Sequence, residues 1–374
     1  MPSTQVRQKI VRSARRVVVK VGTNVLTDSS GRLDPRVIAS LCRQVSRLIE
    51  SGRQMVVVSS GAVGAGVGLL RLPGRPKDLA MLQASAAVGQ GMLMKIFERN
   101  FARHGRHAAQ ILVTRSDFED RRRYVNIRRT LDALHRVGAV PIINENDTVA
   151  VDELRFGDND LIAALTANLV QADLLALLSS VDGLIREGQV VDFVQAVGEE
   201  AFGLVQKSRS ALGVGGMQAK LQAIYLATQA GVDAVLANGR KRSVLDRVIL
   251  AGERMGTVFA GSRNRMAARR GWIAMAVRPA GQLVVDAGAA RALVSGGKSL
   301  LPSGLTDVIG HFERDAVVAV ADADGRELAR GQVNYSSQEI ARIKGRKSNE
   351  IAAILGEKPA DEVIHRNNLI VTAG

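Results

Sequence analysis

The sequence predicts an α/β protein with a mainly parallel sheet, followed by a small, mostly-β domain. From Arg16 onward, short apolar runs rich in β-branched residues alternate with stretches of helical periodicity. Fully apolar strands that alternate with helices are typical of a parallel sheet covered on both faces. The runs end at Gly, Ser, Asn and Asp residues, and ligands of such sheets bind beyond the carboxyl ends of the strands.

Six apolar runs give the expected strands in chain order. They start at Val17, Val56, Ala109, Val140, Leu174 and Asp233 and lead into turns at Gly22, Ser59, Thr114, Asn144, Ser179 and Asn238. Residues 35–50 are expected to form a helix with Pro35 in its first turn. Residues 158–171 form another, and a third follows the glycine-rich stretch that ends at Lys220.

The pattern changes near residue 240. Residues 240–280 carry ten basic and two acidic residues and give few helix or strand signals. From Gly281 the segments become short and rich in turns, and Asp324-Gly325 favours a hairpin between two apolar runs. The predicted division is a basic N-terminal arm at 1–15, an α/β domain at 16–260, a linker at 261–280 and a β domain at 281–374.

Length and composition exclude several classes. The chain has 374 residues, of which 46% are hydrophobic and 23% charged, which fits two globular domains rather than a disordered chain. The formal net charge of +15 raises nucleic acid, a membrane surface or an anionic substrate as partners.

Cys42 is the only cysteine, so an intrachain disulfide and a cysteine zinc site are excluded. It lies at helical apolar spacing and is expected in the core, and a single thiol fits a cytoplasmic location. No apolar run reaches the 18 residues that a membrane span needs. The basic first 16 residues lack the apolar stretch of a secretory signal, so a short disordered arm is expected there.

Lys20 stands at the end of an apolar strand, beside the Gly22 turn. An unpaired ammonium costs several kcal/mol to bury, so an anion is expected to meet it. Only eleven residues of this arginine-rich chain are lysine, which sets Lys20 apart from the general basic background. The alternative is an exposed lysine at the end of a strand.

Residues 59–68 read SSGAVGAGVG and allow two interpretations. The G-x-G-x-x-G spacing of a dinucleotide site is broken at Leu69 and Arg71, and the chain has no G-x-x-x-x-G-K-[ST] motif. The glycines either let backbone N–H groups approach an anion at a helix start or allow close helix packing.

Two clusters of carboxylates and amides flank an expected loop. The first reads Asn144-Glu145-Asn146-Asp147, and the second, Phe156 to Asp160, opens a helix. Such side chains hold the amine and carboxylate of a substrate, or a Mg²⁺ shell. A simple N-cap at Asp158 or Asn159 is the alternative.

Residues 213–220 read GVGGMQAK and lead into a helix. This segment supplies backbone donors and then Lys220, which is expected in the first turn. A cation there opposes the helix dipole, and a bound phosphate would resolve the conflict.

Two lysines, glycine-rich segments and an acidic cluster suit phosphoryl transfer, which depends on positioning and charge neutralisation. Lys20 and Lys220 would hold the transferring group, and Asp160 would pair with both lysines. An acceptor carboxylate needs no general base, because it is already ionised at neutral pH.

The combined motifs VVKVGTNVL, VVSSGAVGAG, PIINENDTVA, FGDNDLIAAL and GVGGMQAKLQAI resemble those of the glutamate 5-kinases of the amino acid kinase family. The C-terminal segment is similar to the PUA domain that many bacterial members carry. The resemblance runs from about Val17 to the end. It implies a three-layer sandwich with a mainly parallel sheet, and ATP-dependent phosphorylation of the L-glutamate side chain in the first step of proline synthesis.

The resemblance also implies site residues. At ATP it implies Lys20, Ser179, Ser180, Val214, Gly215, Gly216, Met217, Gln218, Ala219 and Lys220. At glutamate it implies Ser60, Gly61, Asn144, Asp147, Asp158 and Asn159, with Asp160 organising the lysines. It further implies Mg²⁺ with ATP, a homo-oligomer (dimer or tetramer), inhibition by proline and handover of product to glutamyl phosphate reductase.

Three positions depart from the family. Ser179-Ser180 replace Thr-Asp, residues 185–188 (IREG) replace a Tyr-Thr-x-Asp-Pro stretch in a shortened loop, and Val214 replaces a threonine. The first two differences lie where the base and ribose are expected, so they change the details of the nucleotide contacts there and leave the phosphoryl-transfer residues intact.

Two other functions are compatible with parts of the sequence. The nearest is a kinase of the same fold acting on another carboxylate or phosphate, which the joint presence of both Asn/Asp clusters and the C-terminal domain disfavours. The second is RNA binding by the C-terminal domain. Residues 281–374 hold eleven basic and twelve acidic residues and so lack the basic excess of an RNA binder. Nucleic acid is therefore not expected as a partner.

Overall fold

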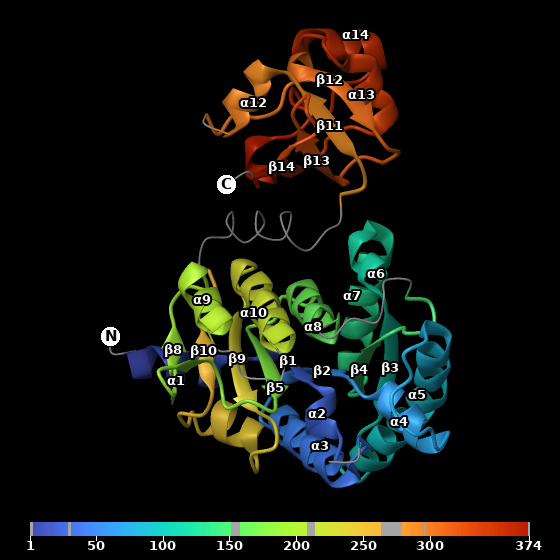
Figure 1. Cartoon of the computed structure of the whole chain (residues 1–374), viewed down its shortest axis with the longest axis vertical. Helices are drawn as coiled ribbons and strands as arrows, with labels where there is room; N and C mark the ends of the chain where they lie inside the picture. The colour runs from blue at the N-terminus through green and yellow to red at the C-terminus, as the bar shows by residue number, and fades with distance from the viewer. Residues whose placement is uncertain are drawn as a thin grey trace. The chain divides into compact units, whose positions relative to one another are not determined.

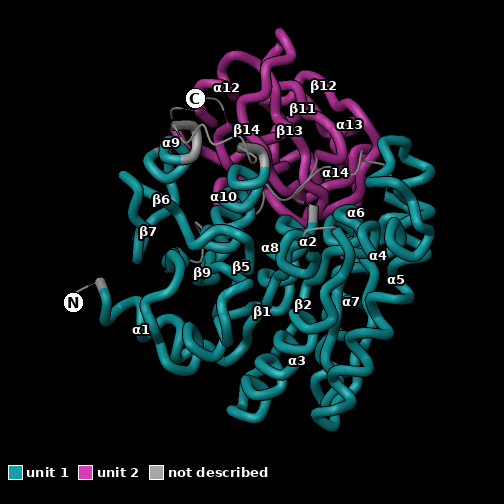
Figure 2. The backbone as a smooth tube through the Cα atoms, turned by 60° about the horizontal axis from the view of Figure 1, so that its bottom comes forward, with its two compact units in different colours: residues 1–262 teal, residues 263–374 magenta. Residues whose placement is uncertain are grey.

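The computed structural model describes residues 3–28, 31–150, 158–207, 214–262, 279–294 and 296–372. The chain divides into two compact units, residues 1–262 and 263–374, drawn in teal and magenta in Figure 2. Most of the predicted linker, residues 263–278, lies outside the described residues. No helix in the described part of the chain is long and apolar enough to cross a membrane.

The first unit is built on an eight-stranded, mostly parallel sheet (Figure 1). In spatial order its strands are β3 (Ala108–Val113), β4 (Val140–Glu145), β2 (Gln54–Ser59), β1 (Arg16–Val21), β5 (Leu174–Ser179), β9 (Asp233–Asn238), β10 (Thr257–Phe259) and β8 (Phe193–Val194). The six predicted strands are all present and pair in parallel. β10 runs antiparallel to β9, and β8 pairs in parallel with β10.

Helices cover both faces of this sheet (Figure 1). They are α1 (Ser3–Ser13), α2 (Thr23–Leu26), α3 (Pro35–Glu50), α4 (Ala62–Leu69), α5 (Leu79–Ala102), α6 (Arg115–Glu119), α7 (Arg121–Arg136), α8 (Asp158–Leu169), α9 (Glu199–Lys207) and α10 (Val214–Gln229). The predicted helix at 35–50 is confirmed as α3, with Pro35 in its first turn and Asp34 accepting a hydrogen bond from the Arg36 amide.

Alternate residues of β1 face opposite layers, as the pleat of a strand requires. Val17, Val19 and Val21 belong to the core that packs on α3 and α5, whereas Lys20 faces the other layer. That second layer contains α8 and α10, which pack on each other and on the central strands. Cys42 is buried on α3 as expected, and burial raises the pKa of its thiol.

The first residues form a helix, so the predicted disordered arm is wrong for residues 3–13. Ile10 and Val11 of α1 are buried, and each such side chain stabilises the fold by about 1.5–3 kcal/mol. The Arg7 guanidinium is buried too and donates to the backbone oxygens of Glu253 and Met255, each at 2.7 Å. Tertiary packing therefore orders a segment whose basic composition suggested an arm.

The basic segment after residue 240 belongs partly to the first unit. A π-helix at Asp246–Leu250 and β10 follow β9, although residues 240–280 show few helix or strand signals in the sequence. Arg7 ties α1 to this region because its Nε also lies 3.0 Å from Asp192 Oδ1, just before β8.

The second unit is a five-stranded sheet with short helices, described by itself. Its strands lie in the order β12 (Leu305–Ile309), β11 (Gln282–Val285), β13 (Val317–Ala321), β14 (Glu327–Gln332) and β15 (Leu369–Val371). Its helices are α12 (Ala287–Val294), α13 (Ser337–Ile343) and α14 (Ile351–Leu355), with 3₁₀ turns at Pro302–Gly304, Ser348–Glu350 and Arg366–Asn368. The predicted hairpin at Asp324-Gly325 joins β13 to β14, with Gly325 at a φ of +82°.

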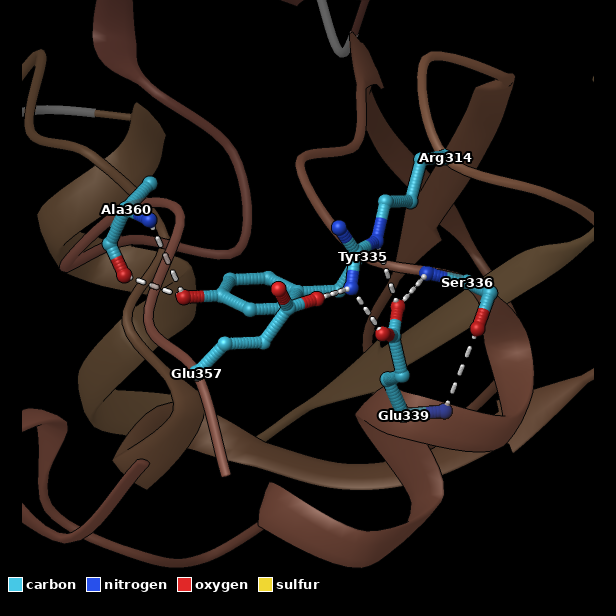
Figure 3. Close-up of polar contacts among 6 residues, drawn as sticks. All are labelled: Arg314, Tyr335, Ser336, Glu339, Glu357 and Ala360. Carbon is cyan, nitrogen blue, oxygen red and sulfur yellow. Dashed lines mark hydrogen bonds and ion pairs between the residues drawn. The ribbon is translucent and has the colours of Figure 1, made fainter. Parts of the chain in front are cut away.

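Side-chain contacts fix the loops of this second unit (Figure 3). The hydroxyl of Tyr335, a buried residue, donates to the Ala360 carbonyl and accepts from its N–H, which anchors the chain after α14. Ser336 and Glu339 form a capping box at the start of α13. Arg314 pairs with both Glu339 and Glu357.

Candidate active site

Three charged side chains from β1, α8 and α10 meet on the α8 side of the sheet. Lys20 Nζ lies 2.7 Å from Asp160 Oδ1, and Lys220 Nζ lies 3.2 Å from Asp160 Oδ2. The predicted pairing of Asp160 with both lysines is confirmed. We call these three residues the lysine cluster.

The charged groups of the lysine cluster are shielded from solvent. The Lys20 and Asp160 side chains are 7% and 1% exposed. Burial lowers the pKa of Lys20, Asp160 partly offsets this effect, and the nearby Lys220 lowers the pKa further. Two ammonium groups and one carboxylate leave one positive charge without a partner in the cluster, and a bound anion would neutralise it.

A chain of amide hydrogen bonds lies next to the lysine cluster. Asn144, at the end of β4, donates from Nδ2 to Gln90 Oε1 at 2.8 Å. Its Oδ1 accepts from Asn159 Nδ2 at 3.1 Å and from the backbone N–H of Glu145 at 2.9 Å. Asn159 directly precedes Asp160, so the amide chain and the lysine cluster meet in the first turn of α8.

The backbone N–H of Glu145 fixes the direction of this amide chain. Because that group can only donate, the Asn144 atom facing it is the oxygen, and Asn144 must donate to Gln90. Gln90 Nε2 and Asn159 Oδ1 are then left buried without a hydrogen-bond partner among the described residues. One end of the chain thus offers a donor and the other an acceptor.

Gln90 was not identified from the sequence. It lies within α5, an apolar helix whose composition gives no sign of a functional side chain. Gly89 beside it packs against α4 so closely that an added Cβ would lie 1.8 Å from the Ala62 oxygen. Gln90 reaches Asn144 at the end of β4 through tertiary packing of α5, of which this close contact with α4 is a part.

The glycine-rich segment after β2 is explained in part by packing. A Cβ at Gly66 would lie 1.8 Å from the Ser85 oxygen, so close contact between α4 and α5 requires glycine there. Gly61 has a φ of +104° and precedes the first residue of α4, a backbone conformation that favours glycine. Ser60 is buried at the end of β2, which is the neighbour of β1.

Lys220 differs from its expected place in one respect. α10 already begins at Val214, so Lys220 stands in its second turn rather than its first. Its Nζ donates to the Gly216 oxygen at 3.1 Å as well as to Asp160. The conflict with the helix dipole is therefore smaller than the sequence suggested, since the effect falls off after the first turn.

The expected nucleotide region lies at the carboxyl end of β5. Ser179 is buried, Ser180 is exposed, and the Ser179 oxygen accepts from the Gly239 N–H at 2.8 Å. The shortened loop beyond them is a two-residue hairpin between β6 (Ile185–Arg186) and β7 (Gln189–Val190). Glu187 and Gly188 at its tip both have positive φ, as a tight hairpin of this kind requires.

For some predicted site residues the structure describes only the backbone, or does not describe the residue. Residues 151–157 and 208–213 are outside the described residues, and only the backbone of Asp158, Val214 and Gly215 is described. Asp147 is half-buried in the turn after β4 and has an interaction partner. Met217, Gln218 and Ala219 follow in α10, between Gly216 and Lys220.

Known proteins match nearly the whole chain in sequence. A model of the amino acid kinase family matches residues 15–238, and a model of the PUA domain matches residues 281–355. The first match covers more than half of the chain and includes the lysine cluster and the amide chain. The fold and the site thus define an amino acid kinase with a PUA domain.

The curated relatives narrow this class. The glutamate 5-kinase of Caldanaerobacter subterraneus subsp. tengcongensis is 47% identical over 363 residues, 95% of this chain and 97% of that protein. The glutamate 5-kinase of Moorella thermoacetica is 47% identical over 365 residues, 96% of each chain. That of Citrifermentans bemidjiense is 45% identical over 372 residues, 98% of this chain and all of that protein. The chain therefore belongs to the amino acid kinase family and, within it, to the glutamate 5-kinases.

Proposed function

We propose that the lysine cluster and the amide chain together carry out the glutamate 5-kinase reaction, the first step of proline biosynthesis. The side-chain carboxylate of L-glutamate attacks the γ-phosphorus of ATP, a new O–P bond forms, and ADP leaves with the electrons of the broken bond. The products are L-glutamyl 5-phosphate and ADP. The acceptor is ionised at neutral pH, so the reaction requires no base to remove a proton.

The observation that carries this proposal is the unbalanced positive charge of the lysine cluster. The two carboxylate oxygens of Asp160 each contact one ammonium group, Oδ1 that of Lys20 and Oδ2 that of Lys220. The transferring phosphoryl group carries negative charge on its equatorial oxygens, and fixed cations in a buried site stabilise it without reorganisation. In this proposal both lysines contact the phosphoryl group and Asp160 is a positioning residue.

The amide chain suits the amino-acid end of the substrate. The buried Asn159 Oδ1 can accept from an ammonium group, and the buried Gln90 Nε2 can donate to a carboxylate. Glutamate carries both groups on its α-carbon. We propose that Asn159 and Gln90 bind them, that Asn144 fixes both amides, and that Ser60, Gly61, Asp147 and Asp158 line the same site.

Mg²⁺ is expected to enter with ATP. Both oxygens of Asp160 already face ammonium groups, so this carboxylate is committed to the lysines. Mg²⁺ in kinases is commonly held by substrate phosphates, waters and one or two carboxylates, which this donor set fits. When bound, the ion neutralises charge on the phosphates.

ATP itself is proposed to bind at Ser179, Ser180 and residues 214–220, beside the lysine cluster. Asp182 lies close to this region and accepts from Asn238 Nδ2 at 3.0 Å and from Lys241 Nζ at 2.9 Å. In this proposal the tight hairpin at Glu187 lies on the side of the base and ribose.

Further properties rest on the family resemblance. We propose a homo-oligomer, inhibition by proline, handover of the product to glutamyl phosphate reductase and a cytoplasmic location. Leu69, Met81 and Val88 on the contacting helices α4 and α5 are 40–44% exposed, which supports burial against a second subunit.

Trapping of the acyl phosphate tests the reaction. The protein is incubated with MgATP, L-glutamate and hydroxylamine, and the γ-glutamyl hydroxamate is measured. A signal with glutamate, but not with aspartate or N-acetylglutamate, is expected. A hydroxamate from either of those substrates but not from glutamate would overturn the substrate assignment. Lys95→Ala, which removes an exposed lysine of α5, serves as the control for substitutions of Lys20 and Lys220.

A further inference from the structure

A pocket, which we call the second pocket to distinguish it from the site on the α8 side, lies on the α3 side of the sheet. It has a volume of about 520 Å³, and its lining includes Val21, Leu178 and Gly239 at the carboxyl ends of β1, β5 and β9. Val21 belongs to the core on the α3 side, whereas Lys20 faces α8. Small-molecule sites commonly have volumes of about 300–1,000 Å³, so this pocket is large enough for a ligand.

Basic side chains dominate the charge of this pocket. Arg36, Arg240, Lys241 and Arg242 line it, together with Asp28 and Asp34. Three of the four basic residues come from the start of the basic segment that has no role in the proposed kinase reaction. We call the guanidinium groups of Arg36, Arg240 and Arg242 the arginine group.

Carboxylates do not neutralise the arginine group. Arg240 donates to the backbone oxygen of Asn24 at 3.0 and 2.7 Å and to that of Thr27 at 2.9 Å, which are neutral acceptors. Arg36 and Arg242 form no side-chain ion pair within the described part of the chain. Lys241 differs, because it pairs with Asp182 at 2.9 Å.

The two carboxylates of the lining have other partners. Asp34 accepts the Arg36 backbone N–H at 2.9 Å, and Asp28 accepts the Arg32 backbone N–H at 3.1 Å. Both bonds hold the backbone at and before the start of α3. These bonds leave both carboxylates charged, but the three guanidinium groups outnumber them, so the lining keeps an excess of positive charge.

We propose that this pocket binds the phosphate group of a small anion through the arginine group. Guanidinium groups match the geometry of phosphate oxygens and form charge-assisted hydrogen bonds with them. Val25, Val37 and Leu41 form an apolar wall beside the arginine group. The wall suits the organic part of a phosphorylated metabolite, such as a nucleoside monophosphate, and inorganic phosphate needs only the arginine group.

Binding of inorganic pyrophosphate to the full-length Lys220→Ala protein tests this site. The background substitution weakens phosphate binding at the lysine cluster, so calorimetry reports mainly on the second pocket. Saturable binding is expected, and adding Arg36→Ala with Arg242→Ala should weaken it by at least about tenfold. Both arginine side chains are exposed, so these substitutions should leave the melting temperature unchanged.

A matched control distinguishes specific binding in the second pocket from general attraction of the anion to a positively charged protein. Arg122→Ala with Arg129→Ala removes two exposed charges from α7 and should leave the dissociation constant within about twofold. Equal weakening by the two pairs of substitutions would overturn the proposal. So would the absence of saturable binding up to about 10 mM pyrophosphate.

Two further probes separate the sources of the phosphate group. Adenosine monophosphate and inorganic phosphate are titrated into the same background protein. Tighter binding of the nucleotide, lost with Arg36→Ala and Arg242→Ala, identifies an organic phosphate that uses the apolar wall. Equal binding of the two, lost in the same way, identifies the inorganic ion. Binding of both that survives these substitutions contradicts the site. Hydroxamate formation by Arg36→Ala with Arg242→Ala should equal that of the unsubstituted protein, which keeps this test separate from the kinase reaction.

Discussion

The two units of this protein each contain a cluster of three charges with the same pattern and opposite sign. In the first unit, the carboxylate of Asp160 lies between the ammonium groups of Lys20 and Lys220. In the second, the guanidinium of Arg314 lies between the carboxylates of Glu339 and Glu357 (Figure 3). Each cluster leaves one charge unbalanced.

The two clusters differ in how far their side chains are exposed to solvent. The side chains of the lysine cluster are 1–17% exposed, whereas those around Arg314 are 21–59% exposed. Water stabilises the extra negative charge in the second unit, but it reaches the extra positive charge in the first unit much less. Between these two clusters, the buried unbalanced charge requires a neutralising ligand, whereas the exposed one is stabilised by water.

The Glu339 carboxylate also has a structural role at the start of α13. It accepts the Ser336 backbone N–H at 2.8 Å, and Ser336 in turn caps α13. The hydrogen bonds from Arg314 lower the pKa of Glu339 to about 2, and burial opposes this effect. No comparable backbone bond is found for Asp160 among the described residues, so its role is to hold the lysines.

Removing the central charge of the lysine cluster should have the largest effect. Asp160→Asn leaves two ammonium groups without their carboxylate and should destabilise the first unit by about 3–5 kcal/mol. Urea unfolding followed by circular dichroism measures the change. Glu357→Gln in the second unit is the control and should change stability by less than about 1 kcal/mol. Similar effects from both substitutions would break the comparison.

Removing one lysine should mainly affect turnover. Lys220→Ala should lower kcat by about 100–1,000-fold, because one of the two fixed cations at the phosphoryl group is lost. The hydroxamate assay measures kcat, and Lys95→Ala should retain full activity. If Lys220→Ala turned over at the rate of the control, the lysine cluster would have no catalytic role.

The amide chain allows a finer test of buried unpaired groups. Gln90→Met removes both the acceptor for Asn144 and the free donor, and should raise the KM for glutamate about tenfold with little change in the KM for ATP. Gln90→Glu keeps an acceptor but adds a negative charge and loses the donor, so it should also raise the KM for glutamate. An unchanged KM in both variants would show that Gln90 does not act at the substrate.

The cluster of Arg314, Glu339 and Glu357 should contribute little to stability and nothing to activity. Arg314→Met should destabilise the second unit by about 1 kcal/mol, the size expected for a partly exposed network. Hydrogen exchange of the α13 amides in the full-length chain measures this local change. Hydroxamate formation should be unaffected, and a loss of turnover at unchanged stability would give Arg314 a role that its position does not suggest.

The smallest expected effect is a loss of stability at the start of α13 as the pH falls. The folded-state pKa of Glu339, about 2, lies below its ordinary value of 4.5, so its stabilising effect is complete above pH 4.5. That effect should be lost as the pH falls from about 4.5 to 2. The protection factors of the α13 amides, which correct for the intrinsic pH dependence of amide exchange, should therefore fall over this range in the unsubstituted protein, and less so in Glu339→Gln. Equal pH dependence in both would mean that other carboxylates dominate.

Much of the fold could be predicted because its signals are local. The apolar run ending at Lys20 is a buried strand, Pro35 begins a helix, and Asp324-Gly325 turns a hairpin, all as expected. The disordered arm was wrong because the order of α1 depends on contacts with Glu253 and Met255, far along the chain. A basic composition contains no information about such partners.

The sequence by itself determined the chemistry of the site. Lysines, a carboxylate and amides at strand and helix ends restrict it to holding an anion and a polar substrate. Only the tertiary structure decided which groups meet, because the parallel sheet brings the ends of distant strands to one edge. It also decided that Gln90 joins Asn144, that Arg240 faces a second pocket, and that Asp160 is shielded from water while Arg314 is not. Burial and hydrogen-bond direction arise from packing between segments far apart in the sequence, which local patterns do not encode.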